Sequence, residues 1–273
     1  MNRADTEALA RAREVLEKPG LAIRLTDLLG RPVEMAVAAL PAPASRLVHR
    51  ATGAALDRAL SVALRTMDAS PDPPADWRHR LAVGAAGAGG GALGLAGLAV
   101  ELPVSTTLML RAIADHARAQ GEDLARPEPR LQCLAVFAYG SPRASDDAAE
   151  AGYFAVRAAL ARSVSEAAEW VAAKGIARAA GDRSAPAMAR LLATVAQRFG
   201  VAVSEKAVAQ LVPLIGAAGG AAVNLAFMSH YQRTAWGHFT VRRLERAHGE
   251  AAVRAAWGPP FRALRTRPRS SNG

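Results

Sequence analysis

Apolar side chains recur every three or four residues along most of the chain, which is the spacing of one face of a helix. In the first such segment, from Asp5 to Glu17, Leu9, Ala12 and Leu16 share that face. β-Branched residues never gather into alternating runs, so we predict no strands. The spacing predicts helices over residues 5–17, 21–40, 45–67, 105–121, 131–139, 146–180, 186–199 and 223–246.

Proline and glycine divide these predicted helices. The Pro-Ala-Pro sequence at residues 41–43 predicts a hinge, because proline lacks the amide hydrogen that a helix interior needs. For the same reason Pro103 predicts a boundary, after which Ser105 or Thr106 can cap a new helix. Helix ends or breaks are expected at Gly121, Gly175 and Gly200.

Composition agrees with an all-α fold. Hydrophobic residues make up 51% of the chain but aromatic residues only 5%, so the apolar content is mostly alanine, leucine and valine, which suits close-packed helices. A chain of 273 residues can bury a sizeable core. We predict a multi-helix bundle, with a single helical domain over residues 1–260 and a basic, disordered tail over residues 261–273.

Two glycine- and alanine-rich segments stand out. The uncharged run at residues 81–100 contains seven glycines, and a shorter run lies inside residues 207–229. Glycines four residues apart, such as Gly87 and Gly91, clear one helical face so that another backbone can approach closely. The first run is long enough to cross a bilayer, yet its glycines lower its hydrophobicity. A membrane hairpin and a tightly packed pair of helices in a soluble core are both compatible with it.

The formal net charge is +10, from 34 basic and 24 acidic residues, and nearly all the basic residues are arginine. Such an excess attracts polyanions, although solvated helix faces are the better explanation for most individual arginines. Trp77, Arg78 and Arg80 immediately precede the first glycine-rich run. A tryptophan beside arginines is typical of a membrane interface, where these side chains would contact headgroups. A helix start with a packed tryptophan has the same sequence.

Few residues suggest catalysis. The single cysteine, Cys133, cannot form an internal disulfide and agrees with a reducing, cytoplasmic compartment. Charged residues interrupt the first apolar positions, so we expect no secretory signal. Phosphate-loop and zinc-protease motifs are absent, and the Gly-x-Gly-x-x-Gly match at residues 89–94 follows no predicted strand. We therefore expect no cofactor and no metal, and we favour a non-enzymatic role.

Glu101 is the first charged residue after the long glycine-rich run, and it lies just before Pro103. It could cap the helix that follows or place a carboxylate at the mouth of the apolar element. Capping is the simpler interpretation.

Several of these features together resemble the EcsC protein family. They are the glycine-rich run ending in Glu101-Leu102-Pro103, the helix containing residues 110–113 and ending at Gly121, and the late Pro213-x-Ile215-Gly216 with Asn224. Family members usually carry aspartate at the position of Glu101. The resemblance implies a bacterial, intracellular accessory protein, linked to a membrane and to ABC-type exporters, with no assigned biochemical role. The matching positions form our candidate functional core: Gly84, Gly87, Gly91, Gly94, Glu101, Pro103, Pro213, Gly216 and Asn224.

Three hypotheses follow. The first is a helical, non-enzymatic protein that associates with the inner face of the cytoplasmic membrane, with an anionic lipid surface or a membrane protein such as an ABC exporter as its partner. The second is a soluble hydrolase or small-ligand or lipid-binding protein whose pocket lies between the glycine-rich elements, with Glu101, Asn224 and a histidine as polar groups. The third, nucleic-acid binding, is the weakest, because the arginines are not interleaved with aromatic residues.

Overall fold

The computed structural model describes residues 1–17, 25, 37–67, 80–87, 94–139, 152–179, 185–210 and 216–258. These residues form helices and turns without a β-strand, which confirms the all-α prediction. Residues 80–87 are helical as well. The named elements are α1 (Arg3–Glu17), α4 (Ala42–Thr66), α6 (Gly94–Ala119), α7 (Pro127–Ala135), η1 (Val136–Ala138), α8 (Tyr153–Lys174), α9 (Ile176–Ala179), α10 (Pro186–Gln210), α11 (Gly216–His248) and α12 (Glu250–Trp257).

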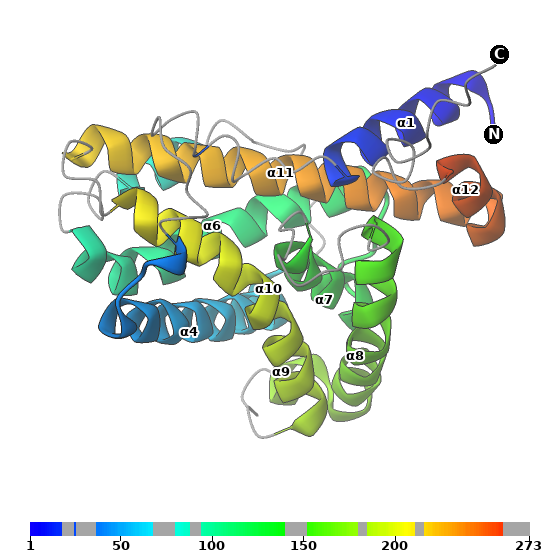
Figure 1. The fold of residues 1–273 in the computed structure, drawn as a ribbon. Helices are drawn as coiled ribbons and strands as arrows, with labels where there is room; N and C mark the ends of the chain where they lie inside the picture. Colours follow the sequence, from blue (N-terminus) through cyan, green and yellow to red (C-terminus); the bar gives the residue numbers. More distant parts are fainter. Residues whose placement is uncertain are drawn as a thin grey trace, which may run out of the picture.

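Helix α11, at 33 residues, is the longest of the described helices, and α1, α6 and α12 pack against it (Figure 1). Helices α1 and α12 pack on the C-terminal half of α11. Leu16 of α1 lies close to Gly237 of α11: a Cβ added to this glycine would lie 3.0 Å from Leu16 Cγ. Helix α6 runs parallel to α11. Hydrogen bonds between residues 123 apart in the sequence join the two helices at both ends, at Asn224 with Glu101 and at Arg243 with Gln120.

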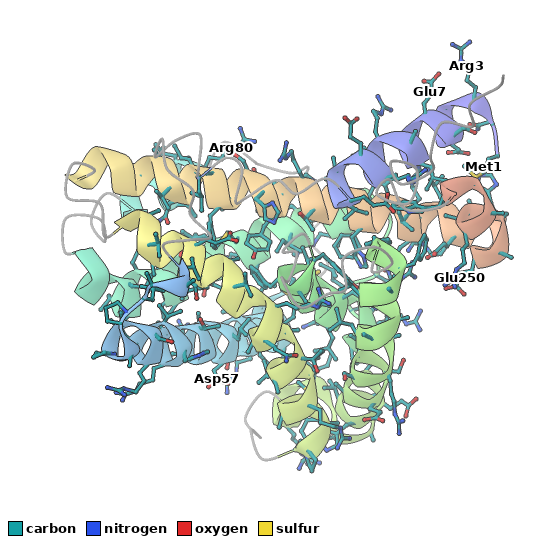
Figure 2. All side chains as sticks on the ribbon, viewed as in Figure 1. Met1, Arg3, Glu7, Asp57, Arg80 and Glu250 are labelled. Carbon is teal, nitrogen blue, oxygen red and sulfur yellow. The ribbon has the colours of Figure 1, made fainter. Side chains whose placement is uncertain are left out.

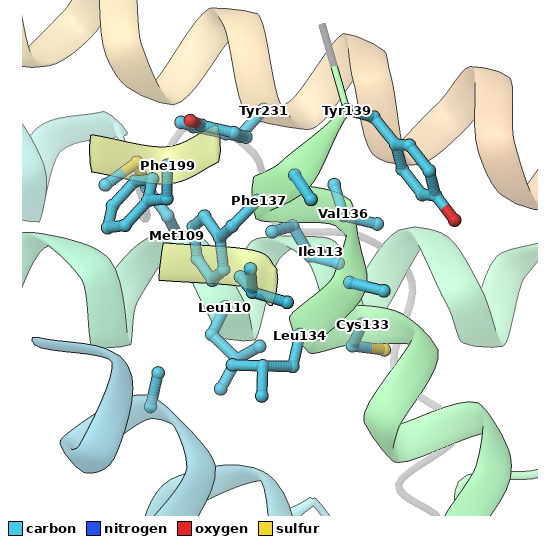
Figure 3. Packing of buried hydrophobic residues seen from close by; sticks show 14 of the residues in the cluster. Met109, Leu110, Ile113, Cys133, Leu134, Val136, Phe137, Tyr139, Phe199 and Tyr231 are labelled. Carbon is cyan, nitrogen blue, oxygen red and sulfur yellow. The ribbon is translucent and has the colours of Figure 1, made fainter. Parts of the chain in front are cut away.

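A cluster of aromatic side chains lies in the core (Figure 3). The buried turn η1 places Phe137 between α10 and α11, with its ring centroid 4.9 Å from that of Phe199 and 5.0 Å from that of Tyr231. Met109 and Ile113 of α6 lie beside these rings. The buried apolar residues, from Leu9 in α1 to Trp257 in α12, form one continuous cluster.

A buried arginine joins α4 to α7. Arg130 is 4% exposed, and its guanidinium donates hydrogen bonds to the carbonyl oxygens of Leu64, at 2.9 Å, and Leu124. The last carbonyl groups of a helix lack partners within the helix, and a cation favours the negative end of the helix dipole. Arg130 therefore fixes the C-terminal end of α4 beside α7. The N-terminal end of α4 lies at the opposite side, together with the N-terminal halves of α6 and α11 (Figure 1).

Ion pairs connect the C-terminal half of α11 to its neighbours. Arg242 contacts both Glu122 and Glu128, at 2.8 and 2.9 Å, and Arg157 forms a two-pronged contact with Glu245. Burial raises the pKa of Glu122, but the hydrogen bonds and charges of Arg242 and Arg246 outweigh this effect, so the pKa lies below its usual value. These arginines form ion pairs inside the molecule. Part of the excess of basic residues is therefore explained by internal contacts and does not require an external anionic partner.

Two predicted boundaries at prolines are wrong. Helix α6 passes through Pro103, because burial of Leu98 and Leu102 before it and Met109 after it outweighs the loss of one backbone hydrogen bond. The carbonyl group that loses its partner belongs to the exposed Ala99. The predicted hinge at residues 41–43 is the start of α4 instead, since the fixed φ of proline suits the first turn of a helix.

Glycine marks helix ends at two of the three predicted positions. Gly121 and Gly175 adopt φ values of +79° and +83°, in the left-handed region that favours glycine, and α6 and α8 end just before them. Gly200 does not end a helix. Helix α10 continues to Gln210, because Val203, Lys206 and Ala207 all become buried on the face that it presents to the core. The predictions for residues 21–36, apart from Leu25, and those for residues 68–79 and 261–273 lie outside the described residues.

Candidate functional site

Two of the candidate residues, Glu101 and Asn224, meet inside the fold together with Lys206. Lys206 Nζ lies 2.6 Å from Glu101 Oε2, and Asn224 Nδ2 donates to Glu101 Oε1 at 2.7 Å. Asn224 Nδ2 also donates to the carbonyl oxygen of Val83 at 3.1 Å. We call Glu101, Lys206 and Asn224 the buried polar cluster. It connects α6, α10, α11 and the helical segment 80–87.

The glycines allow this connection. A Cβ added to Gly87 would lie 2.5 Å from the carbonyl oxygen of Gly220 and 2.6 Å from Asn224 Nδ2. No real side chain tolerates such distances, so the segment 80–87 can lie against α11 only because position 87 has no side chain. Gly84 is less tightly placed, because its added Cβ would lie 3.7 Å from Leu225 Cδ2, an ordinary van der Waals distance.

The cluster is buried and contains two ionisable side chains. Lys206 is fully buried and Glu101 is 5% exposed. Burial lowers the pKa of Lys206, while the charge and hydrogen bond of Glu101 oppose that effect. The ring of Phe227 lies 5.4 Å from Lys206 Nζ and adds a favourable face to the cation. Among the described residues, Asn224 Oδ1 is buried without a hydrogen-bond partner.

Glu101 is not a helix cap. It lies within α6, well past the first turn, and its carboxylate accepts hydrogen bonds from Lys206 and Asn224 rather than from backbone amides at a helix start. The capping interpretation is therefore wrong. The alternative, a carboxylate at the mouth of the apolar element, does not describe its position either, because Glu101 lies inside α6 and is 5% exposed.

Lys206 was not among the sequence candidates. The chain has only three lysines among 34 basic residues. Lys206 directly precedes the uncharged run from Ala207 to Ser229. A compact ammonium group fits a fully buried pair with one carboxylate better than the larger guanidinium group, which presents five donors. A lysine in an arginine-rich chain, directly before a long uncharged run, was the available signal.

Some of the remaining candidate residues lie in the described part of the chain, and the others lie outside it. Gly94 and Gly216 are the first residues of α6 and α11, and Pro103 lies in the interior of α6. Arg80 donates a hydrogen bond from Nε to Gln232 Oε1 at 3.0 Å (Figure 2). Trp77, Arg78, Gly91 and Pro213 lie outside the described residues.

The arrangement around the buried polar cluster is closely packed. The backbones of Gly87 and Gly220 are in direct contact, so no ligand fits between the two glycine-rich elements at that level. The charges of Lys206 and Glu101 are satisfied by each other and are shielded from solvent. Histidine, cysteine and carboxylate side chains of the described residues form no group that could hold a metal ion.

Within the described part of the chain, one helix is long and apolar enough to cross a membrane by length and composition. It covers Gly97–Ala119 of α6, and 61% of its most apolar window is buried inside the fold. A buried core helix of a soluble protein has the same properties, so this helix alone is weak support for membrane contact.

The fold and the cluster define a class: an all-α bundle in which glycine-rich helices pack around a buried lysine–carboxylate–amide cluster. The sequence pattern of the EcsC protein family matches residues 33–244, and the chain belongs to that family. The matched region contains all three residues of the buried polar cluster. No curated protein and no solved structure shows significant similarity to the chain.

Proposed function

We propose that this EcsC-family protein is a non-enzymatic accessory factor that docks on the inner face of the cytoplasmic membrane. It would use the end of the molecule formed by the segment 80–87 and the N-terminal halves of α6 and α11. One observation carries the proposal: the placement of the exposed large apolar side chains. In the described residues these are Leu81 (69% exposed), Val100 (74%), Val104 (49%), Leu225 (38%) and, at the chain start, Met1 (41%).

Four of these five side chains therefore lie on the glycine-rich elements that meet at the buried polar cluster. We call Leu81, Val100, Val104 and Leu225 the apolar end. Val100 and Val104 are one helical turn apart and flank the inward-pointing Glu101. Leu225 follows Asn224 directly and lies beside Gly84 of the segment 80–87. Exposed apolar side chains gathered in this way are typical of a membrane or protein contact surface.

The interior of the same end supports the proposal. Close backbone contact through glycine, as between Gly87 and Gly220, holds helices together even where lipid removes the hydrophobic driving force. The charged pair of Lys206 and Glu101 faces inward and is paired, as ionisable groups are in membrane-embedded helices. This end would therefore keep its structure when its outer side chains enter the headgroup and acyl region.

The pocket hypothesis has less support. Glu101 and Asn224 do converge, as that hypothesis requires, but Lys206 occupies the remaining carboxylate oxygen of Glu101. Backbone atoms of Gly87 and Gly220 fill the space between the elements. For a partner beyond the lipid, the family resemblance suggests an exporter subunit, which the docked protein would meet in the same membrane.

A vesicle-binding measurement tests the proposal. The wild-type protein should co-sediment with vesicles of phosphatidylcholine and phosphatidylglycerol. A Leu81→Gln/Val100→Thr variant should bind them at least about tenfold more weakly, because burying one such side chain in an apolar phase contributes about 1.5–3 kcal/mol. The comparison is of apparent partition coefficients at equal protein concentration.

Thermal unfolding of the same variant provides the control. Both side chains are exposed, and exposed substitutions change stability by less than about 0.5 kcal/mol, so its melting temperature should match that of the wild type. Equal vesicle binding by the wild type and the variant would refute docking through the apolar end. Failure of the wild type to bind vesicles at all would refute the proposed function itself.

A further inference from the structure

A basic surface lies at the same end of the molecule, on α4. His49 and Arg50 follow Arg46 by three and four residues, so both lie on the same side of the helix as Arg46, and all three are exposed. We call them the α4 basic face. Acidic residues are absent from residues 42–56, and the acidic residue of α4, Asp57, lies further along the helix (Figure 2). The charge of the face is therefore uncompensated along its own helix.

These arginines differ from those that form the internal ion pairs of the C-terminal half of α11. Arg157 and Arg242 are held by carboxylates, whereas Arg46 and Arg50 form no ion pair with any described residue. An arginine without an internal partner keeps all of its donors available for an external anion. Arg46 and Arg50 therefore contribute charge that is available to an anionic surface.

The position of the face relates it to the apolar end. Arg130 ties the C-terminal end of α4 to α7, which follows the C-terminal end of α6, so α4 and α6 begin at the same end of the molecule (Figure 1). Arg46 and Arg50 lie in the first turns of α4, and so at the same end of the molecule as the apolar end. Exposed arginines and exposed apolar side chains at one end of a molecule match a bilayer, in which acyl chains lie directly below anionic headgroups.

We propose that the α4 basic face binds anionic lipid headgroups while the apolar end enters the bilayer. This inference rests on the proposed function and assigns the headgroup contact to Arg46 and Arg50. The sequence prediction placed that contact at Trp77, Arg78 and Arg80. Arg80, the one of these that the structure describes, already donates a hydrogen bond to Gln232.

The test compares two double variants that have the same net charge. Arg46→Gln/Arg50→Gln removes two arginines from the α4 basic face. Arg3→Gln/Arg162→Gln removes two exposed arginines that form ion pairs on other helices, with Glu7 and Glu166. Binding is measured at low salt to vesicles of phosphatidylcholine alone and of phosphatidylcholine with phosphatidylglycerol.

We expect the first variant to bind the anionic vesicles about 20- to 30-fold more weakly than the wild type, since each arginine near an anionic surface contributes about fivefold. The second variant should change binding by less than about twofold, because charges beyond a screening length contribute little. The difference between the variants should shrink as salt is added.

Three results would overturn the inference while leaving docking through the apolar end intact. They are equal weakening by both variants, equal wild-type binding to neutral and anionic vesicles, and unchanged vesicle binding by Arg46→Gln/Arg50→Gln. If that last variant instead lost binding to a single-stranded oligonucleotide, the face would belong to a nucleic-acid site. Absence of wild-type binding to every vesicle would refute the proposed function as well.

Discussion

Replacing Lys206 by methionine is expected to destabilise the protein by about 3–5 kcal/mol. Methionine has nearly the length of lysine, so the variant leaves little empty space. It does leave the carboxylate of Glu101 buried, with the amide of Asn224 as its one described hydrogen-bond donor. Removing one partner of a buried ion pair costs far more than an exposed pair contributes. The measurement is the free energy of unfolding in urea.

A double variant separates loss of charge balance from loss of packing. In Glu101→Gln/Lys206→Met the uncompensated charge is gone, and the glutamine oxygen can still accept the hydrogen bond of Asn224. We expect this variant to recover at least about half of the lost stability, since a buried pair is often replaceable when both charges leave together. A cost below about 1 kcal/mol for Lys206→Met alone would contradict a charged, buried pair. Additive effects of the two substitutions would show that Glu101 and Lys206 are not coupled.

Replacing Gly87 by alanine is expected to destabilise the protein by about 3 kcal/mol, the upper part of the usual range for overpacking. The added methyl group would lie 2.5 Å from a backbone oxygen and 2.7 Å from Asn224 Cβ. Neither atom belongs to the far end of a flexible side chain. Relief of the clash would therefore require the segment 80–87 to move away from α11, which would break the hydrogen bond from Asn224 to Val83.

Gly84→Ala is the matched control, one helical turn earlier in the same segment. Its methyl group would make an ordinary contact with Leu225, and alanine favours a helix over glycine by up to about 1 kcal/mol. We expect this variant to be slightly more stable than the wild type. Opposite signs for the two alanines in denaturant unfolding would support close packing at Gly87. Stabilisation by both would mean that the segment 80–87 does not contact α11 as described.

Local sequence patterns predicted the helices well and their boundaries less well. The helix ends at Gly121 and Gly175 are confirmed, because both glycines adopt a backbone conformation that other residues rarely adopt. Pro103 and Gly200 carry the same local signals, yet both lie inside helices. Burial of the residues on either side decides these cases. That burial depends on contacts with distant segments, which a local pattern does not contain.

The candidate site was partly predictable. Glu101 was selected as the first charge after the long glycine-rich run, and both Glu101 and Asn224 were selected from the family resemblance. The two side chains do form a hydrogen bond. Lys206 could not be placed beside them, because its position depends on α10 continuing past Gly200. The basic face on α4 was also missed, since the sequence does not distinguish the arginines that form internal ion pairs from those that remain exposed. Whether the cluster and these arginines serve function stays a prediction.

Site-specific labelling tests the central claim, that the apolar end enters the membrane, most directly. A Val100→Cys variant can be labelled with a polarity-sensitive fluorophore, since the natural Cys133 is fully buried. A labelled Arg3→Cys variant is the control, because Arg3 lies on the outer side of α1 at the far end of the molecule (Figure 2). Upon addition of phosphatidylcholine–phosphatidylglycerol vesicles, we predict a blue shift and quenching by lipid-attached quenchers at position 100 and no change at position 3. Bound protein with a label at position 100 that still reports water would contradict the account.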